Sequence, residues 1–148
     1  MIATLRSAVA QDGEAISDIL SGWIDETPWM PRIHTHEEDR AFGKWLVEVC
    51  DVTVAEKDQQ VVGFLARQGA EIQALYLHKS ARGQGLGTAL LDHAKIKSSE
   101  LGLWTFQANT PAQRFYLTNG FTENQRTDGQ GNDEKLPDIH FQWVRDGA

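Results

Sequence analysis

A glycine-dense turn between an apolar segment and a helical pattern restricts the fold of this chain more than any other feature. Residues 75–88 read LYLHKSARGQGLGT. The first amides of a helix have no partner within it, and the helix dipole adds partial positive charge at that end. Glycines at alternate positions let a phosphate approach the backbone without obstruction by Cβ atoms. The segment therefore predicts an anion cradle, most naturally for a phosphate or pyrophosphate.

Two common nucleotide-binding motifs fit this turn poorly. A P-loop ends in Gly-Lys-Ser/Thr, whereas Gly87 is followed by Thr88 and Ala89. A dinucleotide fingerprint that starts at Gly83 requires a third glycine at position 88, and it usually opens a β-α-β unit of a parallel sheet. A nucleotide binder of another class and a turn without any ligand remain as alternatives.

The periodicity around the turn predicts alternating strands and helices. Strands are expected over 2–8, 52–57, 61–68, 71–78, 103–108, 121–126 and 138–145. Helices are expected over 14–25, from Thr35 to Val49, from the glycine turn to Leu101, and from Thr110 to Asn119. The order β-α-α-β-β-β-α-β-α-β-β predicts an α/β fold with a mixed sheet and helices on its faces. We expect one domain over 1–148.

Local signals set several of these boundaries. Thr35 and Glu38 have the spacing of a capping box, and residues 57–60 form the expected turn of a hairpin. Gly102 lies where a glycine closes a helix, and the polar residues 127–137 predict a long loop. The expected apolar stripe of the second helix consists of Phe42, Trp45, Leu46 and Val49.

The composition excludes several classes of partner and site. With 14 Lys+Arg against 21 Asp+Glu, the formal net charge is −7, which argues against nonspecific nucleic-acid binding and against docking on anionic membranes. An amine or cationic partner is compatible with this charge. Cys50 is the single cysteine, so neither an intramolecular disulfide nor a cysteine metal cluster is possible. Without a long apolar run, a cytoplasmic protein is expected.

The residues around the turn resemble a known family. The segment RGQGLG at 82–87 matches the Arg/Gln-x-x-Gly-x-Gly/Ala signature of the GNAT superfamily of acyl-CoA-dependent N-acyltransferases. Asn109, the Phe-Tyr pair at 115–116 and the Asn-Gly-Phe at 119–121 are similar to a second segment of that family. The resemblance in sequence is firm over about 60–125, and the rest of the chain is similar to the family in the order of its expected elements. It implies a GNAT-like fold and an N-acetyltransferase that takes acetyl-CoA as acyl donor and needs no metal.

The resemblance also implies where the cofactor binds. In that family the strand before the turn splays from its neighbour, and the pantetheine arm pairs with its free backbone groups. The amides of the turn would hold the pyrophosphate, and Asn109 would contact the amide or thioester region. A backbone N–H near Leu77 would stabilise the oxyanion. The implied cofactor-binding residues are Leu75, Tyr76, Leu77, Arg82, Gly83, Gln84, Gly85, Leu86, Gly87, Thr88, Asn109 and Tyr116.

The implied reaction is direct attack of a neutral amine on the thioester in a ternary complex. Tyr116 matches the family's proton donor to the leaving thiolate, although a tyrosine of the core would fit the same pattern. A lysine-like amine has a pKa near 10.4, so a base must remove its proton. Glu71 is similar in placement to the family's carboxylate base, and Glu56, His78 or water remain alternatives. Trp104 stands where some relatives carry a different glutamate base.

The acceptor itself is less defined by the sequence. Trp29 and Met30 lie in a proline-containing loop that commonly walls the acceptor site in similar proteins. His34 and His36 have no third metal ligand at a recognisable spacing, so no metal is expected there. A small-molecule amine, a peptide N-terminus and a lysine are all compatible, and similar proteins are often homodimers. A non-catalytic acyl-CoA-binding or sensing module is the alternative function.

Overall fold

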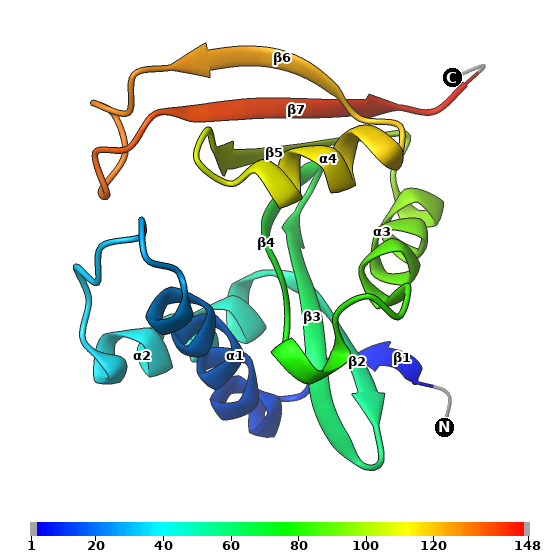
Figure 1. Ribbon diagram of the computed structural model, residues 1–148. Coiled ribbons are helices and arrows are strands. Elements are labelled where there is room, and N and C mark those ends of the chain that lie inside the picture. Colours follow the sequence, from blue (N-terminus) through cyan, green and yellow to red (C-terminus); the bar gives the residue numbers. More distant parts are fainter. Residues whose placement is uncertain (1–2, 147–148) are drawn as a thin grey trace.

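One mixed β-sheet organises residues 3–146, the part of the chain that the computed structural model describes (Figure 1). The strands are β1 (Thr4–Ser7), β2 (Asp51–Lys57), β3 (Gln60–Gln68), β4 (Glu71–Leu77), β5 (Glu100–Phe106), β6 (Thr122–Thr127) and β7 (Asp138–Val144). The helices are α1 (Gly13–Glu26), α2 (His36–Val49), α3 (Leu86–Lys97) and α4 (Thr110–Thr118), with short 3₁₀ turns η1 (Ala10–Asp12) and η2 (Lys79–Ala81). The strand order is β1-β2-β3-β4-β5-β7-β6. Fold class and element order are as expected from the sequence.

The two faces of the sheet bury separate hydrophobic cores. Successive residues of a strand point to opposite faces, and β3 accordingly places Phe64 in one core and Leu65 in the other. The core beneath α1 and α2 consists of Ile16, Ile19, Leu46, Val52, Val54, Phe64, Ala66 and Ala74. The core beneath α3 and α4 includes Leu65, Leu90, Leu91, Leu101, Leu103, Tyr116, Phe121, Ile139 and Phe141.

Strands β4 and β5 diverge almost from their beginning. They are the one parallel pair in the sheet of residues 3–146, and a single register pair, Glu71 with Gly102, joins them. The Gly102 amide donates to the carbonyl of Ala70 at 2.8 Å. Figure 1 shows β5, β6 and β7 crossing the top of the view at a steep angle to β2, β3 and β4. Beyond the pair of Glu71 with Gly102, the β4 backbone on the side of β5 is therefore not paired with β5.

The expected hairpin and capping box are both present. Antiparallel β2 and β3 meet at Asp58 and Gln59, whose φ angles of 53° and 65° are those a tight two-residue hairpin turn requires. At the start of α2, the Glu38 amide donates to Thr35 Oγ1 at 3.1 Å and the Thr35 amide donates to Glu38 Oε1 at 2.9 Å. This reciprocal pair fixes where α2 begins.

The expected apolar stripe of α2 is wrong in all but Leu46. That residue is buried, whereas Phe42, Trp45 and Val49 are about two-fifths exposed. The helix instead packs against α1 through small and polar residues, because a Cβ at Gly43 would lie 2.0 Å from Ser17 Oγ. Close approach of the two helices therefore decides which face of α2 is buried.

The expected end of the third helix is also wrong. Helix α3 ends at Lys97, and Gly102 lies inside β5 rather than after a helix. Leu101 and Leu103 point into the core beneath α3 and α4, so Gly102 faces the other side of the sheet. There a Cβ would lie 2.9 Å from both Glu71 and His140. A glycine is needed at position 102 because the Glu71 and His140 side chains lie so close to it, and not because it caps a helix.

Smaller boundary differences complete the comparison. Strand β1 is shorter than the expected segment 2–8, of which residue 2 lies outside the described residues, as do 1, 147 and 148 of the expected domain. Asn109, and not Thr110, is the N-cap of α4. None of the helices within 3–146 combines the length and the apolar character that a bilayer crossing needs.

Candidate active site

The glycine turn leads from the open end of β4 into α3. Gly85 is the N-cap of that helix, and Gly83 and Gly85 have φ angles of 75° and 82°. L-residues with side chains rarely adopt these angles. A Cβ at either position would meet no atom within 4 Å, so the space before the turn is open. The glycines therefore serve backbone conformation and access, and not close packing within the chain.

The residues at the start of α3 border that open space. The first hydrogen bond of the helix runs from Ala89 to the Gly85 carbonyl at 3.0 Å, so the preceding amides have no helical partner. With the helix dipole, they form a site for an anion. Arg82 lies beside this turn, forms an ion pair with Glu26 of α1, and donates to the Leu77 carbonyl at 3.1 Å.

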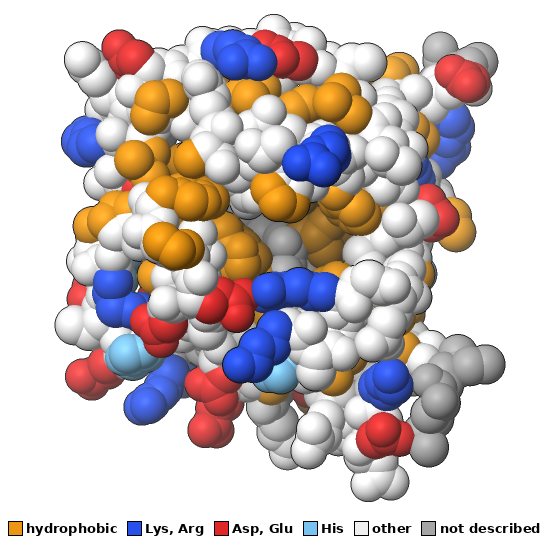
Figure 2. Space-filling view, viewed as in Figure 1, with side chains coloured by type: hydrophobic (Ala, Val, Ile, Leu, Met, Phe, Trp, Pro, Cys, Tyr) orange, Lys and Arg blue, Asp and Glu red, His pale blue; other side chains and the backbone are white. Residues whose placement is uncertain are grey.

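A cavity of about 650 Å³, here the cofactor cavity, joins the turn to the gap between β4 and β5. Figure 2 shows the hollow near the centre of this face, bordered by hydrophobic side chains and with Lys or Arg side chains along its lower rim. The predicted residues that line it are Leu75, Tyr76, Leu77, Arg82, Gly83, Gly85, Leu86, Gly87, Thr88, Asn109 and Tyr116. Gln84 is not among them, because its side chain bonds Lys57 and Ser80 instead.

Tyr116 on α4 reaches the cofactor cavity from the core. The residue is 8% exposed, and its ring packs against Phe115 and Phe121 at centroid distances of 5.2 and 5.5 Å. Burial raises the pKa of the Tyr116 phenol well above its ordinary value, with a smaller contribution from Tyr76. The phenol therefore remains protonated at neutral pH and can donate a hydrogen bond or a proton.

A second cavity of about 630 Å³, here the acceptor cavity, continues from the first. The residues that line both cavities are Trp23, Tyr76, Trp104, Thr105 and Asn109. The residues that line the acceptor cavity alone are Phe106, Gln125, Thr127, Gly131, Asn132 and Asp138. Asp138 is the one acidic or basic side chain among the residues that line the acceptor cavity. Burial raises the pKa of Tyr76, which lines both cavities, to about 12.

Asp138 and Asn109 are both held by neighbouring groups. The Asp138 carboxylate accepts from the Thr127 hydroxyl and, at 3.2 Å, from the Asn132 amide nitrogen. Asn109 caps α4 with its side-chain oxygen, which accepts from the Ala112 amide at 3.2 Å. This leaves the Asn109 NH₂ group available where the cavities meet.

Glu71 lies at the closed end of the strand opening and lines neither cavity. Its Oε1 is 3.4 Å from His140 Nε2, while Asn124 Nδ2 is 3.1 Å from His140 Nδ1. The His140 ring packs edge-on against Trp104 at 4.9 Å, and Trp104 lines both cavities. Glu71 is therefore connected to the cavities through its contact with His140 and the packing of His140 on Trp104.

The other two candidate bases lie elsewhere. Glu56 on β2 accepts from Arg6 at 2.9 Å and lines neither cavity. His78 accepts from the Ser80 amide at 3.1 Å and so caps η2. Within residues 3–146, no three His, Cys, Asp or Glu side chains are grouped so that they could hold a metal ion.

The sequence did not indicate most of the acceptor cavity. Trp23 looked like a core residue of α1, and Asp138 had no motif around it. Trp29 was expected to wall the acceptor site, and its ring packs at 5.8 Å from both Trp23 and Phe106, which line that cavity. These side chains come from separate segments, so no spacing along the chain could reveal their meeting.

Comparison with known proteins identifies the family. A model described as an acetyltransferase (GNAT) domain matches residues 48–123, more than half of the chain. Peptidyl-lysine N-acetyltransferase YjaB of Salmonella typhimurium (strain LT2) is 28% identical over 130 residues, which are 86% of this chain and 89% of that protein. The protein of the same name from Escherichia coli (strain K12) is 27% identical over 146 residues, 97% of this chain and 99% of that protein.

Solved structures share the fold. Apo YjaB from Escherichia coli has a TM-score of 0.81 at 24% identity, covering 98% of this chain and 99% of that one. The yncA structure from Salmonella typhimurium, which contains its cofactor acetyl-CoA, has a TM-score of 0.74 at 20% identity, covering 100% and 96%. The chain belongs to the GNAT acetyltransferase family and is an N-acetyltransferase that transfers the acetyl group of acetyl-CoA to an amine.

Proposed function

We propose that the acceptor is the ε-amine of a lysine side chain in a peptide or protein, and that it attacks acetyl-CoA directly within a ternary complex. The observation that carries the proposal is that two cavities meet at shared residues and differ in character. Both contain aromatic rings, but the first includes the glycines at the start of α3, whereas the second includes one carboxylate, that of Asp138. The relatives named peptidyl-lysine N-acetyltransferases support this acceptor.

Backbone groups place the donor. The amides from Gly83 to Thr88 would bind the pyrophosphate. The side of the Leu75–Leu77 backbone that faces the strand opening would pair with the pantetheine arm as an added strand, beside the Leu77 carbonyl that Arg82 contacts. This path brings the thioester, which supplies the activated acetyl group, to the junction of the two cavities. The Asn109 NH₂ group and a β4 amide near Leu77 would donate to the acyl oxygen there.

Side chains of the acceptor cavity suit a lysine better than a short amine. Trp104 and Phe106 on β5, with Trp23 on α1, would cover the methylenes of the lysine and remove them from water. Asp138 would attract the ammonium group, since a carboxylate in a partly enclosed site favours a cation. The lysine would thus enter from the side of β6 and β7, opposite the glycine turn.

Three proton transfers accompany the reaction, because the ammonium nitrogen loses two protons and the sulfur gains one. The amine must lose a proton before it attacks, and we propose that Glu71 receives this proton. Since Glu71 lines neither cavity, the proton would pass through bridging water. The neutral amine adds to the acyl carbon and the acyl oxygen becomes an oxyanion. The oxyanion then collapses, the carbon–sulfur bond breaks, and the nitrogen gives its second proton to water. Tyr116 would then donate a proton to the leaving thiolate. Burial raises the pKa of the Tyr116 phenol, so the phenol carries this proton at neutral pH.

A panel of matched peptides tests the proposed acceptor. Thiol release from acetyl-CoA is measured with an Nα-blocked peptide containing one lysine, the same peptide with norleucine in its place, and an unblocked peptide without lysine. We expect turnover with the blocked lysine peptide and none with the norleucine peptide. Turnover with only the free N-terminus, or with neither peptide, would contradict a lysine acceptor.

A further inference from the structure

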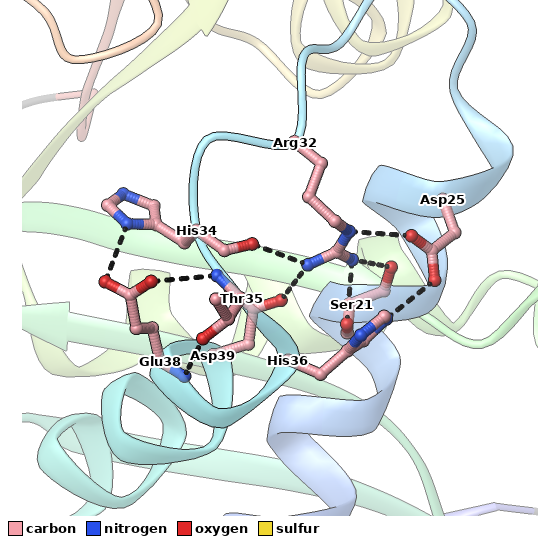
Figure 3. Close-up of polar contacts among 8 residues, drawn as sticks. All are labelled: Ser21, Asp25, Arg32, His34, Thr35, His36, Glu38 and Asp39. Carbon is pink, nitrogen blue, oxygen red and sulfur yellow. Dashed lines mark hydrogen bonds and ion pairs between the residues drawn. The ribbon is translucent and has the colours of Figure 1, made fainter.

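A single guanidinium holds the loop between α1 and α2. Figure 3 shows Arg32 of this loop pointing toward Ser21, Asp25 and Asp39. Its Nε donates to Asp25 Oδ1 at 2.8 Å, and its Nη1 donates to Asp39 Oδ2 at 2.7 Å and to the His34 carbonyl at 3.0 Å. Its Nη2 donates to the carbonyl and the hydroxyl of Ser21 at 2.9 and 2.8 Å. These five hydrogen bonds use all the donors that a guanidinium has.

The partners of Arg32 come from both helices that flank the loop. Ser21 and Asp25 belong to α1, while Asp39 belongs to the first turn of α2 and is only 4% exposed. A buried carboxylate needs a paired cation, so Asp39 makes the Arg32 contact costly to break. A second contact, His36 Nε2 to Asp25 Oδ2 at 3.2 Å, joins the same two helices (Figure 3). The loop therefore has one fixed position between α1 and α2.

The loop carries Trp29 to the acceptor cavity. The Trp29 ring lies 5.8 Å from Trp23 at an interplanar angle of 79°, and 5.8 Å from Phe106 at 70°. Trp23 and Phe106 line the acceptor cavity, but Trp29 and Arg32 line neither cavity. Trp29 thus packs from outside against two walls of that cavity, one on α1 and one on β5.

We propose that Arg32 is a positioning residue for acceptor binding. By fixing the loop it keeps Trp29 between Trp23 and Phe106, which sets the shape of the acceptor cavity, and it touches neither substrate. The inference rests on the proposed function in that the amine enters this cavity. None of the hydrogen bonds of Arg32 reaches a residue that lines the cofactor cavity. Trp29 meets Phe106, which lines the acceptor cavity alone, and Trp23, which lines both, so the effect should fall mainly on the acceptor.

Steady-state kinetics of Arg32→Lys and Trp29→Ala test this inference. Lysine keeps the charge beside Asp39 but cannot donate in five directions. We expect each variant to raise the KM of the acceptor about tenfold, with kcat and the KM of acetyl-CoA nearly unchanged. Trp29→Phe restores most of the acceptor KM. Arg40→Lys, an exposed substitution on α2, is the matched control and leaves both KM values unchanged.

A double-variant cycle separates positioning from a merely structural role. Because Arg32 acts through Trp29, adding Arg32→Lys to Trp29→Ala should raise the acceptor KM no further. Additive effects, equal changes in both KM values, or an unchanged acceptor KM in folded Arg32→Lys would overturn the proposal. If the wild type takes a free N-terminus instead of lysine, the lysine acceptor is contradicted, and the same cycle with the N-terminal peptide still decides the role of Arg32.

Discussion

The cofactor cavity and the acceptor cavity adjoin each other but are built in different ways. The cofactor side includes the segment from Leu75 to Thr88, whose turn glycines expose main-chain groups, together with residues of α1, β5 and α4. The acceptor side is formed by side chains of α1, β5, β6, β7 and the loop before β7. A site made of backbone is sensitive to conformation, whereas a site made of side chains is sensitive to chemical identity. Substitutions should therefore separate the two sides cleanly.

The largest expected effect is on the backbone side. Gly85→Val places a β-branched residue at a φ of 82° and puts a side chain before the amides of α3. We expect the KM of acetyl-CoA to rise on the order of 100-fold, equivalent to about 2.8 kcal/mol of lost binding, with the acceptor KM unchanged. Initial rates over a matrix of both substrate concentrations give the two constants.

Gly69→Val is the matched control for this substitution. Gly69 has a φ of 62° in the turn between β3 and β4, and a Cβ there would also meet nothing within 4 Å. The variant has the same kind of backbone strain outside both cavities, so it should lower stability but leave both KM values unchanged. A similar rise in the acetyl-CoA KM for the two variants would show that strain alone is responsible.

The next largest effect concerns the two tyrosines. Tyr116→Phe should lower kcat roughly 100-fold while CoA still binds, because it removes the phenol that we propose as proton donor to the thiolate. Tyr76→Phe, which removes the other phenol lining the cofactor cavity, should change kcat only slightly. Stopped assays of thiol release give kcat, and calorimetric titration gives CoA affinity. A folded wild type that binds CoA but never turns over would favour the sensing module instead.

The raised pKa of Tyr116 also predicts the alkaline pH profile. A phenol with an ordinary pKa near 10 would begin to lose its proton above about pH 9. Burial raises the pKa of Tyr116, so its donor form persists to higher pH, and kcat should not fall between about pH 8 and pH 10 through this group. A loss of kcat in that range, absent from Tyr116→Phe, would contradict the assignment.

A moderate effect is expected on the side-chain side. Asp138→Asn keeps the shape of the residue but removes the carboxylate charge in the acceptor cavity. We expect the KM of the lysine peptide to rise about tenfold, with the acetyl-CoA KM unchanged, the reverse of Gly85→Val. Asp133→Asn, which removes the same charge at an exposed position in the loop before β7, is the control and should alter neither constant.

The smallest effect lies outside both cavities. Arg6 pairs with Asp12 at 2.8 Å and with Glu56 at 2.9 Å, and its hydrogen bond lowers the pKa of Asp12. A lowered folded-state pKa contributes stability above the unfolded value of about 3.9, and this stability is lost as pH falls below it. Asp12→Asn should lower Tm by roughly 3 °C at neutral pH, with less difference below about pH 4 and both KM values intact. Thermal unfolding at several pH values checks this.

The same contrast explains what the sequence could predict. The turn at 82–88 and the Thr35 capping box depend on neighbours along the chain, and both are where the local pattern placed them. Gly102 resembled a helix cap because its packing against Glu71 and His140 comes from residues far away in sequence. Local signals predict what local chemistry determines.

The acceptor side shows the limit of such prediction. Asp138 follows a polar loop with no motif, and its importance depends on β7 lying beside β5. No motif surrounds Arg32, because its partners lie on both flanking helices and only folding brings them together. The spacing of Phe42, Trp45 and Val49 predicted the wrong buried face of α2. Close contact between α1 and α2 at Gly43 buries a different face of that helix.

A ¹H–¹⁵N correlation spectrum during titration with coenzyme A tests the central claim most directly. We predict that the largest amide shifts fall on 75–77 and 83–88, while Asn132, Asp138 and the other residues found only in the acceptor cavity shift little. No binding to the folded protein at millimolar coenzyme A, or shifts centred on the acceptor cavity with the turn unchanged, would contradict a cofactor held by the main chain at the start of α3.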